Sequence, residues 1–186
     1  MAKKVFGSFL IMLFSILSFL FFKTGAYKSV VVEEAQAPNF QMFYVEHVGP
    51  YHEIIDSLSY VETEFQKLKH PCKKTFGHFL SDPEIIEHEK LVSHTGCVFD
   101  IQNSPQLLTL PDRVQQKVFK SDLNTRPKCF KGSFKGSPSL SALKVYPKLK
   151  ALADKERIKV SQDYLEVYTV EKSSVLTEVY LCEEAS

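Results

Sequence analysis

The chain has 186 residues, of which 44% are hydrophobic and 24% are charged, and its formal net charge at pH 7 is +1. This composition is that of an ordinary globular protein, so it excludes a disordered, collagen-like or coiled-coil chain. Lysine and glutamate are interspersed without a basic tract that would neutralise a row of phosphates, so we expect no nucleic-acid partner. Beyond an apolar N-terminal segment, roughly 150 residues remain, which is the size of one typical domain.

The N-terminal segment, residues 1–24, contains an apolar run that follows Lys3 and Lys4 and ends at Lys23. As a helix at 1.5 Å per residue, its apolar part is roughly 27 Å long, about the thickness of one hydrocarbon core. We therefore predict one N-terminal transmembrane helix, with a cleaved signal peptide as the alternative. The lysines favour an amino terminus inside the cytoplasm, so we expect a single-pass membrane protein with an extracytoplasmic domain. Residues 25–39 are interpreted as a tether.

The domain, residues 40–186, begins with an extended segment that ends at Gly49-Pro50, where glycine and proline mark a turn. Apolar residues then recur at three- and four-residue spacing, which predicts an amphipathic helix. This stripe consists of Tyr51, Ile54, Ile55, Leu58, Val61, Phe65 and Leu68. Two strands follow, at 75–80 and 91–100. The first module, about 40–101, therefore has the order strand, helix, strand, strand.

A second copy of this pattern follows a polar connection that contains a short predicted strand at 114–119. An extended segment at 128–134 leads to Gly136-Ser137-Pro138 and then to a second helical stripe. Its members are Leu140, Leu143, Tyr146, Leu149 and Leu152. Pro147 lies within the stripe, so we predict a kink or two short helices there.

Strands at 162–169 and 175–182, joined by a hairpin turn, complete the second module at about 126–183. The two modules repeat one architecture at an offset of roughly 85 to 90 residues. The predicted fold class is therefore α+β, with two strand-helix-strand-strand modules after the N-terminal helix.

One strand of the second module carries a chemically distinctive pattern. Alternation along an extended strand places Tyr164, Glu166 and Tyr168 on one face and places Leu165 and Val167 on the other. A carboxylate between two rings suits a cationic or hydrogen-bond-donating guest. The alternative is an outer strand with a solvated glutamate, since Glu and Tyr are often exposed. If the carboxyl group lines an empty pocket, burial should raise its pKa.

The four cysteines are too scattered for a zinc ribbon. In an oxidising compartment the repeat favours Cys72 with Cys97 and Cys129 with Cys182, because each pair lies at comparable edges of its module. Free thiols in the core are the alternative. The six histidines show no metal-binding spacing, so we expect neither a metal nor a cofactor.

Several motifs, in this order, resemble the GyrI-like small-molecule-binding domains of the bacterial effector-binding domain superfamily. They are Gly49-Pro50-Tyr51 before the long helix, His78-Phe79-Leu80-Ser81-Asp82-Pro83, and Tyr164-Leu165-Glu166-Val167-Tyr168 before a final strand. A membrane-anchored branch typified by the testis-expressed ER-phagy receptor is similar in its N-terminal anchor and in Tyr146-Pro147. The resemblance covers roughly 40–181.

The resemblance implies a pseudo-twofold pair of modules with a central cleft between them. Family members bind amphipathic, often cationic, organic molecules there, against aromatic walls and an acidic residue. The expected ligand-binding residues are Glu166, Tyr164, Tyr168, Tyr51 and Tyr44. Leu165 and Val167 are then expected to pack under the helices.

This chain departs from the family in two ways. It has no tryptophan, so contacts between a cation and a ring would rely on Tyr and Phe. It also lacks the acidic-aromatic autophagy motif of the receptor branch, so we do not expect that role. Two other functions remain open: a small-molecule hydrolase with Glu166 as general base, and a membrane-tethered scaffold that binds an unidentified protein through a loop at Lys131 to Lys135.

Overall fold

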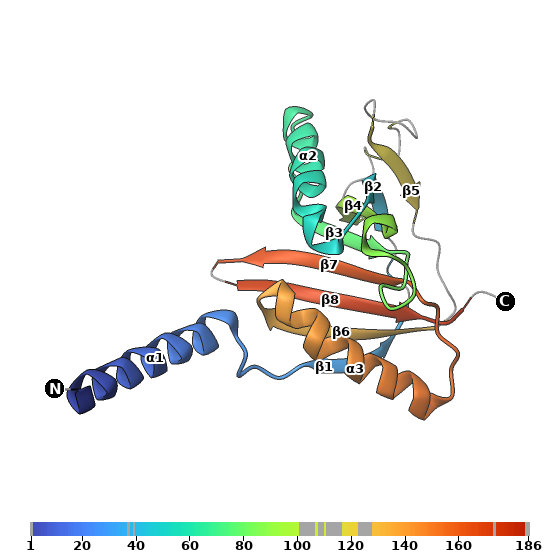
Figure 1. Ribbon diagram of the computed structural model, residues 1–186. Helices are drawn as coiled ribbons and strands as arrows, with labels where there is room; N and C mark the ends of the chain where they lie inside the picture. The colour runs from blue at the N-terminus through green and yellow to red at the C-terminus, as the bar shows by residue number, and fades with distance from the viewer. Residues whose placement is uncertain are drawn as a thin grey trace.

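The computed structural model describes residues 2–36, 38, 40–100, 107, 110, 117–122, 128–172 and 174–184. Within these residues the chain forms α-helices, short 3-10 helices and strands in a mixed order, which confirms the predicted α+β class (Figure 1). The elements are α1 (Ala2–Thr24), β1 (Val31–Ala35), β2 (Phe40–Val48), η1 (Tyr51–Glu53), α2 (Ile54–Lys67), β3 (Lys74–Phe79), η2 (His88–Lys90), β4 (Val92–Asp100), β5 (Phe119–Asp122), β6 (Cys129–Gly136), α3 (Pro138–Glu156), β7 (Tyr164–Glu171) and β8 (Ser174–Cys182).

The strands of the described residues form one antiparallel sheet in the order β1-β6-β8-β7-β3-β4-β2-β5. Pairing of β3 with β7 joins the two modules, and its register sets Gly77 opposite Glu166. Gly77 also pairs with Thr95 of β4, just as Glu166 pairs with Val179 of β8. Gly77 therefore occupies in the first module the position that Glu166 occupies in the second.

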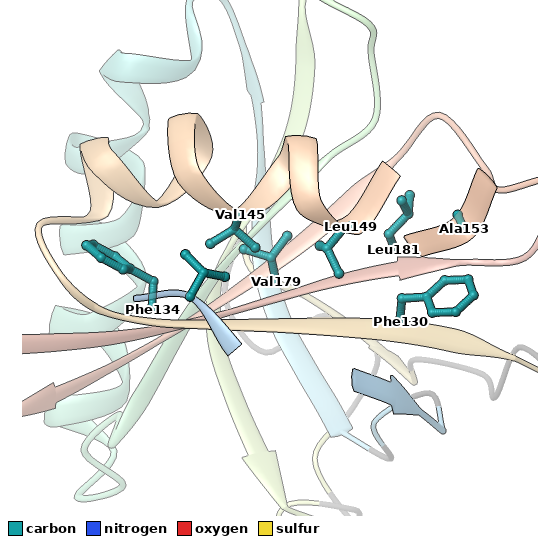
Figure 2. Packing of buried hydrophobic residues seen from close by; sticks show 8 residues of the cluster. Phe130, Phe134, Val145, Leu149, Ala153, Val179 and Leu181 are labelled. Carbon is teal, nitrogen blue, oxygen red and sulfur yellow. The ribbon is translucent and has the colours of Figure 1, made fainter. Parts of the chain in front are cut away.

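Helices α2 and α3 cover the same face of the sheet, which we call the helix face. Val45 of β2 belongs to the core cluster of Val61 on α2, and Val179 of β8 belongs to the cluster of Val145 on α3 (Figure 2). Paired residues of antiparallel strands point to the same face, so one row crosses the helix face from β2 to β6. The row consists of Val45, Thr95, Gly77, Glu166, Val179 and Gly132.

The opposite face of the sheet has a core of its own. Leu165 and Val167 are buried there with Phe76, Val98 and Tyr180, all of which come from strands. The prediction that Leu165 and Val167 pack under the helices is therefore wrong. The alternation itself is as expected, but the sheet buries apolar side chains on both faces, so alternation does not tell which face the helices cover.

The two main helices differ in how well their stripes follow the sequence pattern. Helix α2 buries three of the predicted residues, Ile54, Val61 and Phe65. Helix α3 runs unbroken through Pro147 and buries Ser141, Val145, Leu149 and Ala153. Leu143, which the pattern placed in the core, is exposed. Most of these buried side chains are smaller than leucine, and α3 lies close to the sheet, since a Cβ on Gly132 would collide with Val145.

The N-terminal segment forms the predicted helix, α1, and most of its described side chains are exposed. Among the described residues, no helix has the length and apolar character needed to cross a membrane. The predicted transmembrane anchor is therefore not confirmed.

The interpretation of 25–39 as a tether needs correction. Val31–Ala35 form β1, which pairs with β6 at the edge of the sheet. Just before β1, the end of α1 is held by the start of α3: the Ser137 amide donates to the Thr24 carbonyl at 2.9 Å, and the Lys144 ammonium donates to two further carbonyls, those of Ala26 and Lys28. Backbone pairing and these hydrogen bonds fix the segment to the second module.

Two disulfides tie the modules internally, Cys72–Cys97 in the first and Cys129–Cys182 in the second. This is the pairing that the repeat favours. Cys129 and Cys182 are also partners in the register of β6 and β8, so the second bond joins strands that are already neighbours.

Two other expectations concern the segments before and within β6. Residues 114–116 of the predicted short strand lie outside the described residues, whereas Phe119–Asp122 form β5 at the sheet edge. The proposed loop at Lys131 to Lys135 is instead part of β6. The Lys131 ammonium lies 2.8 Å from the Glu33 carboxylate, so this lysine forms an ion pair between β6 and β1.

Candidate functional site

The candidate site is centred on Glu166, in the middle of β7 at the seam where the two modules meet. Its side chain lies on the helix face, and only 4% of its surface is exposed. Gly77 opposite it has no side chain, and the Phe79 ring takes the place of one, because a Cβ on Gly77 would lie 2.8 Å from Cζ of Phe79. The first module thus contributes a glycine covered by an aromatic ring, and the second contributes the carboxylate.

Two phenols hold the carboxylate. Tyr168, two residues along β7, donates a hydrogen bond of 2.7 Å to Oε2 of Glu166. Tyr146 of α3 donates to Oε1. Because one donor comes from the sheet and the other from the helix above it, the carboxylate is fixed between α3 and β7. The alternative of a solvated glutamate on an outer strand is therefore wrong.

The electrostatics follow from this enclosure. Burial raises the pKa of Glu166, and the hydrogen bonds from Tyr146 and Tyr168 lower it in part. Burial, followed by repulsion from the nearby carboxylate, raises the pKa of Tyr146 and of Tyr168 well above that of a free phenol. Both phenols therefore remain hydrogen-bond donors at neutral pH, while Glu166 is easier to protonate than an ordinary glutamate.

A pair of stacked rings lies beside the carboxylate. The rings of Tyr146 and Tyr164 are nearly parallel, at 11°, with their centroids 4.2 Å apart. Burial raises the pKa of the Tyr164 hydroxyl, and the Lys150 ammonium that contacts it lowers this pKa in part. The stack therefore lies between the carboxylate at one phenol and a cationic side chain at the other.

The remaining predicted site residues lie in different places. The ring of Tyr51 packs on Phe79, with centroids 4.7 Å apart, and Phe79 pairs with Tyr164 across the seam. However, the Tyr51 hydroxyl donates to the Ser81 carbonyl at 2.6 Å and accepts from the Ser81 amide. Tyr51 is thus next to the site, and its hydroxyl is bonded to the backbone of the segment that follows β3.

Tyr44 does not belong to the site, which corrects the prediction. It neighbours Val45 in β2 and therefore points to the opposite face, where its ring stacks on His94 with centroids 4.2 Å apart. Strand alternation separates it from Glu166 by the thickness of the sheet.

Tyr146 belongs to the candidate site through its hydrogen bond to Glu166, although the sequence predicted only a helix residue there. Its place in the apolar stripe of α3 predicted a core side chain, and its ring is indeed mostly covered. What the stripe did not show is that its hydroxyl points to a carboxylate on another strand. The tyrosine next to Pro147, in a stripe otherwise made of leucine, is the signal in the sequence.

Within the described residues, no three His, Cys, Asp or Glu side chains are close enough together to hold a metal ion. The chemistry at the seam is that of one buried carboxylate, phenol donors and aromatic surface. Such a site can receive a hydrogen-bond donor or a cation, or transfer a proton to a bound molecule.

Solved structures with a similar fold match most of the chain. A chain in the cryo-EM structure of an EcmrR–DNA complex has a TM-score of 0.59 at 14% identity, over 98% of this chain and 69% of that chain. A hydrolase from Listeria innocua has a TM-score of 0.51 at 10% identity, and an uncharacterized conserved protein from the same organism has 0.56 at 11%; each match covers 89% of this chain and 98% of the other.

At these identities the similarity shows the fold alone, and that fold is consistent with the predicted GyrI-like architecture. No protein-family model and no curated protein matches the chain. The branch typified by the ER-phagy receptor is not supported.

Proposed function

We propose that this chain is a GyrI-like effector-binding domain that binds a small amphipathic cation at the seam between its modules, with Glu166 as the acidic anchor. The observation that carries the proposal is the buried Glu166 carboxylate, set opposite Gly77 and beside stacked tyrosine rings. The fold of its structural neighbours supports small-molecule binding in general.

The hydrogen bonds at Glu166 leave capacity for a ligand. A carboxylate offers about four lone-pair sites, and the two phenols use one on each oxygen. An ammonium group can therefore bind the remaining lone pairs without displacing Tyr146 or Tyr168. Its alkyl or aromatic part would then lie against the Tyr146–Tyr164 stack, since rings attract cations and exclude water.

Isothermal titration calorimetry of the full chain with hexylamine tests the proposal. Loss of a charge-assisted hydrogen bond removes about 1.5–3 kcal/mol, so Glu166→Gln should weaken hexylamine binding roughly 10- to 100-fold. Glu178→Gln is the matched control, because Glu178 pairs with Val167 on the opposite face of the same hairpin. Equal affinity of wild type and Glu166→Gln, or an equal loss in both variants, contradicts the proposal.

A hydrolase with Glu166 as general base is the second candidate, because a structural neighbour is a hydrolase from Listeria innocua. The raised pKa of Glu166 brings this group closer to the range in which a general base works. The two candidates differ in their products. A hydrolase turns over a reactive ester or epoxide and loses the rate in Glu166→Gln, whereas a binding domain forms a stoichiometric complex without product.

We also propose that the domain lies in an oxidising compartment, outside the cytoplasm. The two disulfides support this placement, since such bonds persist in oxidising compartments and are rare in the cytosol. Alkylation of the protein in cells with a thiol reagent tests it. Cysteines that react without prior reduction contradict the proposal.

We propose further that α1 associates with a membrane. Ile11, Phe14 and Phe22 are among its many exposed apolar side chains, and burying such surface in lipid is favourable. Liposome flotation of the full chain should be lost in the double variant Ile11→Lys, Phe14→Lys. It should persist in Val170→Lys, a change at an exposed position of β7. Unchanged flotation in the double variant contradicts the proposal.

A further inference from the structure

Two buried hydroxyls under α3 have no hydrogen-bond partner among the described residues. They belong to Ser141 of α3 and Thr177 of β8, and both residues have 0% of their surface exposed. A buried polar group is normally hydrogen-bonded, because leaving it without a partner forfeits the bonds it made with water. Two such groups in one layer of the molecule therefore need a chemical explanation.

Both hydroxyls belong to the layer next to Tyr168. Thr177 pairs with Tyr168 in β7 and with Phe134 in β6, so its side chain shares the helix face with Glu166. Helix α3 starts two residues after β6 ends and returns over it, and Figure 2 shows Phe134 at one end of the cluster and Ala153 at the other. Val145 lies against Gly132 of β6, and Ser141 is one turn before Val145 on the same side of α3, toward the end of β6 that carries Phe134.

We propose that Ser141 and Thr177 form an inner polar subsite of the Glu166 site, which takes a hydroxyl or carbonyl oxygen at the far end of the ligand. This inference rests on the proposed binding of a cation at Glu166. In this proposal the helix supplies one hydroxyl, the sheet supplies the other, and one polar atom of the ligand bonds to both.

Strand geometry sets the size of the ligand. Glu166 and Thr177 are diagonal neighbours on adjacent strands, because Tyr168 is the direct partner of Thr177. Their Cα atoms are then roughly 8 Å apart, since strands lie about 4.8 Å apart and two residues along a strand span about 6.8 Å. The subsite therefore selects a short amino alcohol, or an amine with a carbonyl at the same distance, over a plain alkylamine.

Calorimetry of the full chain with two pairs of probes tests the subsite. Each pair has equal chain length: butylamine with 4-aminobutanol, and hexylamine with 6-aminohexanol. The measured quantity is the Kd of the alkylamine divided by the Kd of the amino alcohol of the same pair. Relative to wild type, this ratio should fall roughly three- to tenfold in Thr177→Val, the factor that one neutral hydrogen bond supplies. Ser141→Ala is the second variant and should shift the ratio in the same direction.

Thr169→Val is the matched control. Its hydroxyl also has no partner among the described residues, but Thr169 pairs with Leu176 and points to the opposite face. The ratio should be that of wild type in this control and in Glu166→Gln, where both probes of a pair lose affinity equally. An unchanged ratio in Thr177→Val and Ser141→Ala, with both amines still dependent on Glu166, overturns the subsite and leaves the proposed function intact. If no amine binds wild type, the proposed function fails and the subsite fails with it.

Discussion

Replacing Tyr146 by phenylalanine isolates the hydrogen bond that α3 makes to the buried carboxylate. The variant keeps the ring, and with it the stack on Tyr164, but leaves Oε1 of Glu166 without this donor. A hydrogen bond to a charged group contributes about 1.5–3 kcal/mol. We therefore expect Tyr146→Phe to lower the free energy of unfolding by about this amount where Glu166 is ionised.

The loss should depend on pH with a definite sign. Burial raises the folded-state pKa of Glu166 above its unfolded value, so ionisation of this group destabilises the fold as pH rises through the folded pKa. The phenol of Tyr146 opposes that effect by stabilising the carboxylate, and its removal raises the pKa further. At low pH the protonated carboxyl loses only a neutral hydrogen bond, of about 0.5–1.5 kcal/mol. The variant should therefore lose more stability at high pH than at low pH.

Urea denaturation followed by circular dichroism, at about pH 4 and about pH 8, measures both losses. Tyr60→Phe is the matched control, since Tyr60 is a partly exposed residue of α2 away from the carboxylate. The reasoning is refuted if Tyr146→Phe loses the same stability at both pH values, or no more than Tyr60→Phe does.

Three further predictions concern the carboxylate, the space opposite it and the second disulfide. Glu166→Gln removes the titrating group, so its free energy of unfolding should fall less than that of wild type as pH rises through the raised pKa; parallel curves from urea denaturation would contradict this. Gly77→Ala forces a methyl group against Phe79 and should cost about 1–3 kcal/mol by overpacking; an unchanged denaturation midpoint would show that the seam has spare room. Replacing Cys129 and Cys182 by serine opens the bond between β6 and β8 and should cost about 2–5 kcal/mol in the same assay; a loss well below that range would show that the strand pairing alone holds this end of the sheet.

Much of the framework was predictable from local patterns. The alternation of Tyr164, Glu166 and Tyr168 against Leu165 and Val167 was correct, because it depends only on the geometry of one extended strand. Within the two modules, the order of helices and strands followed from apolar spacing and turn residues, whereas β1 was missed. The disulfides followed the repeat, since equivalent edges of two similar modules bring cysteines together in the same way.

The rest depends on contacts between distant segments. Both faces of this sheet carry apolar side chains, so no local pattern showed that Leu165 faces away from the helices or that Tyr44 lies on the far side. Tyr146 lies within hydrogen-bonding distance of Glu166 only because α3 packs close to the sheet over β6 and β8. Likewise, no local pattern marks Gly77, because only the β3–β7 register sets it opposite the carboxylate.

The pairing of Gly77 with Glu166 has a consequence for the orientation of a ligand that binds as we propose. A duplicated domain with the same residue at both positions would put two carboxylates side by side, and their repulsion would keep one protonated. Here the two positions differ, so one half of the domain carries the charge and the other half has a glycine covered by the Phe79 ring. An amine bound as we propose would therefore have a carboxylate on one side of the seam and an aromatic ring on the other, and its charged end would point to the second module.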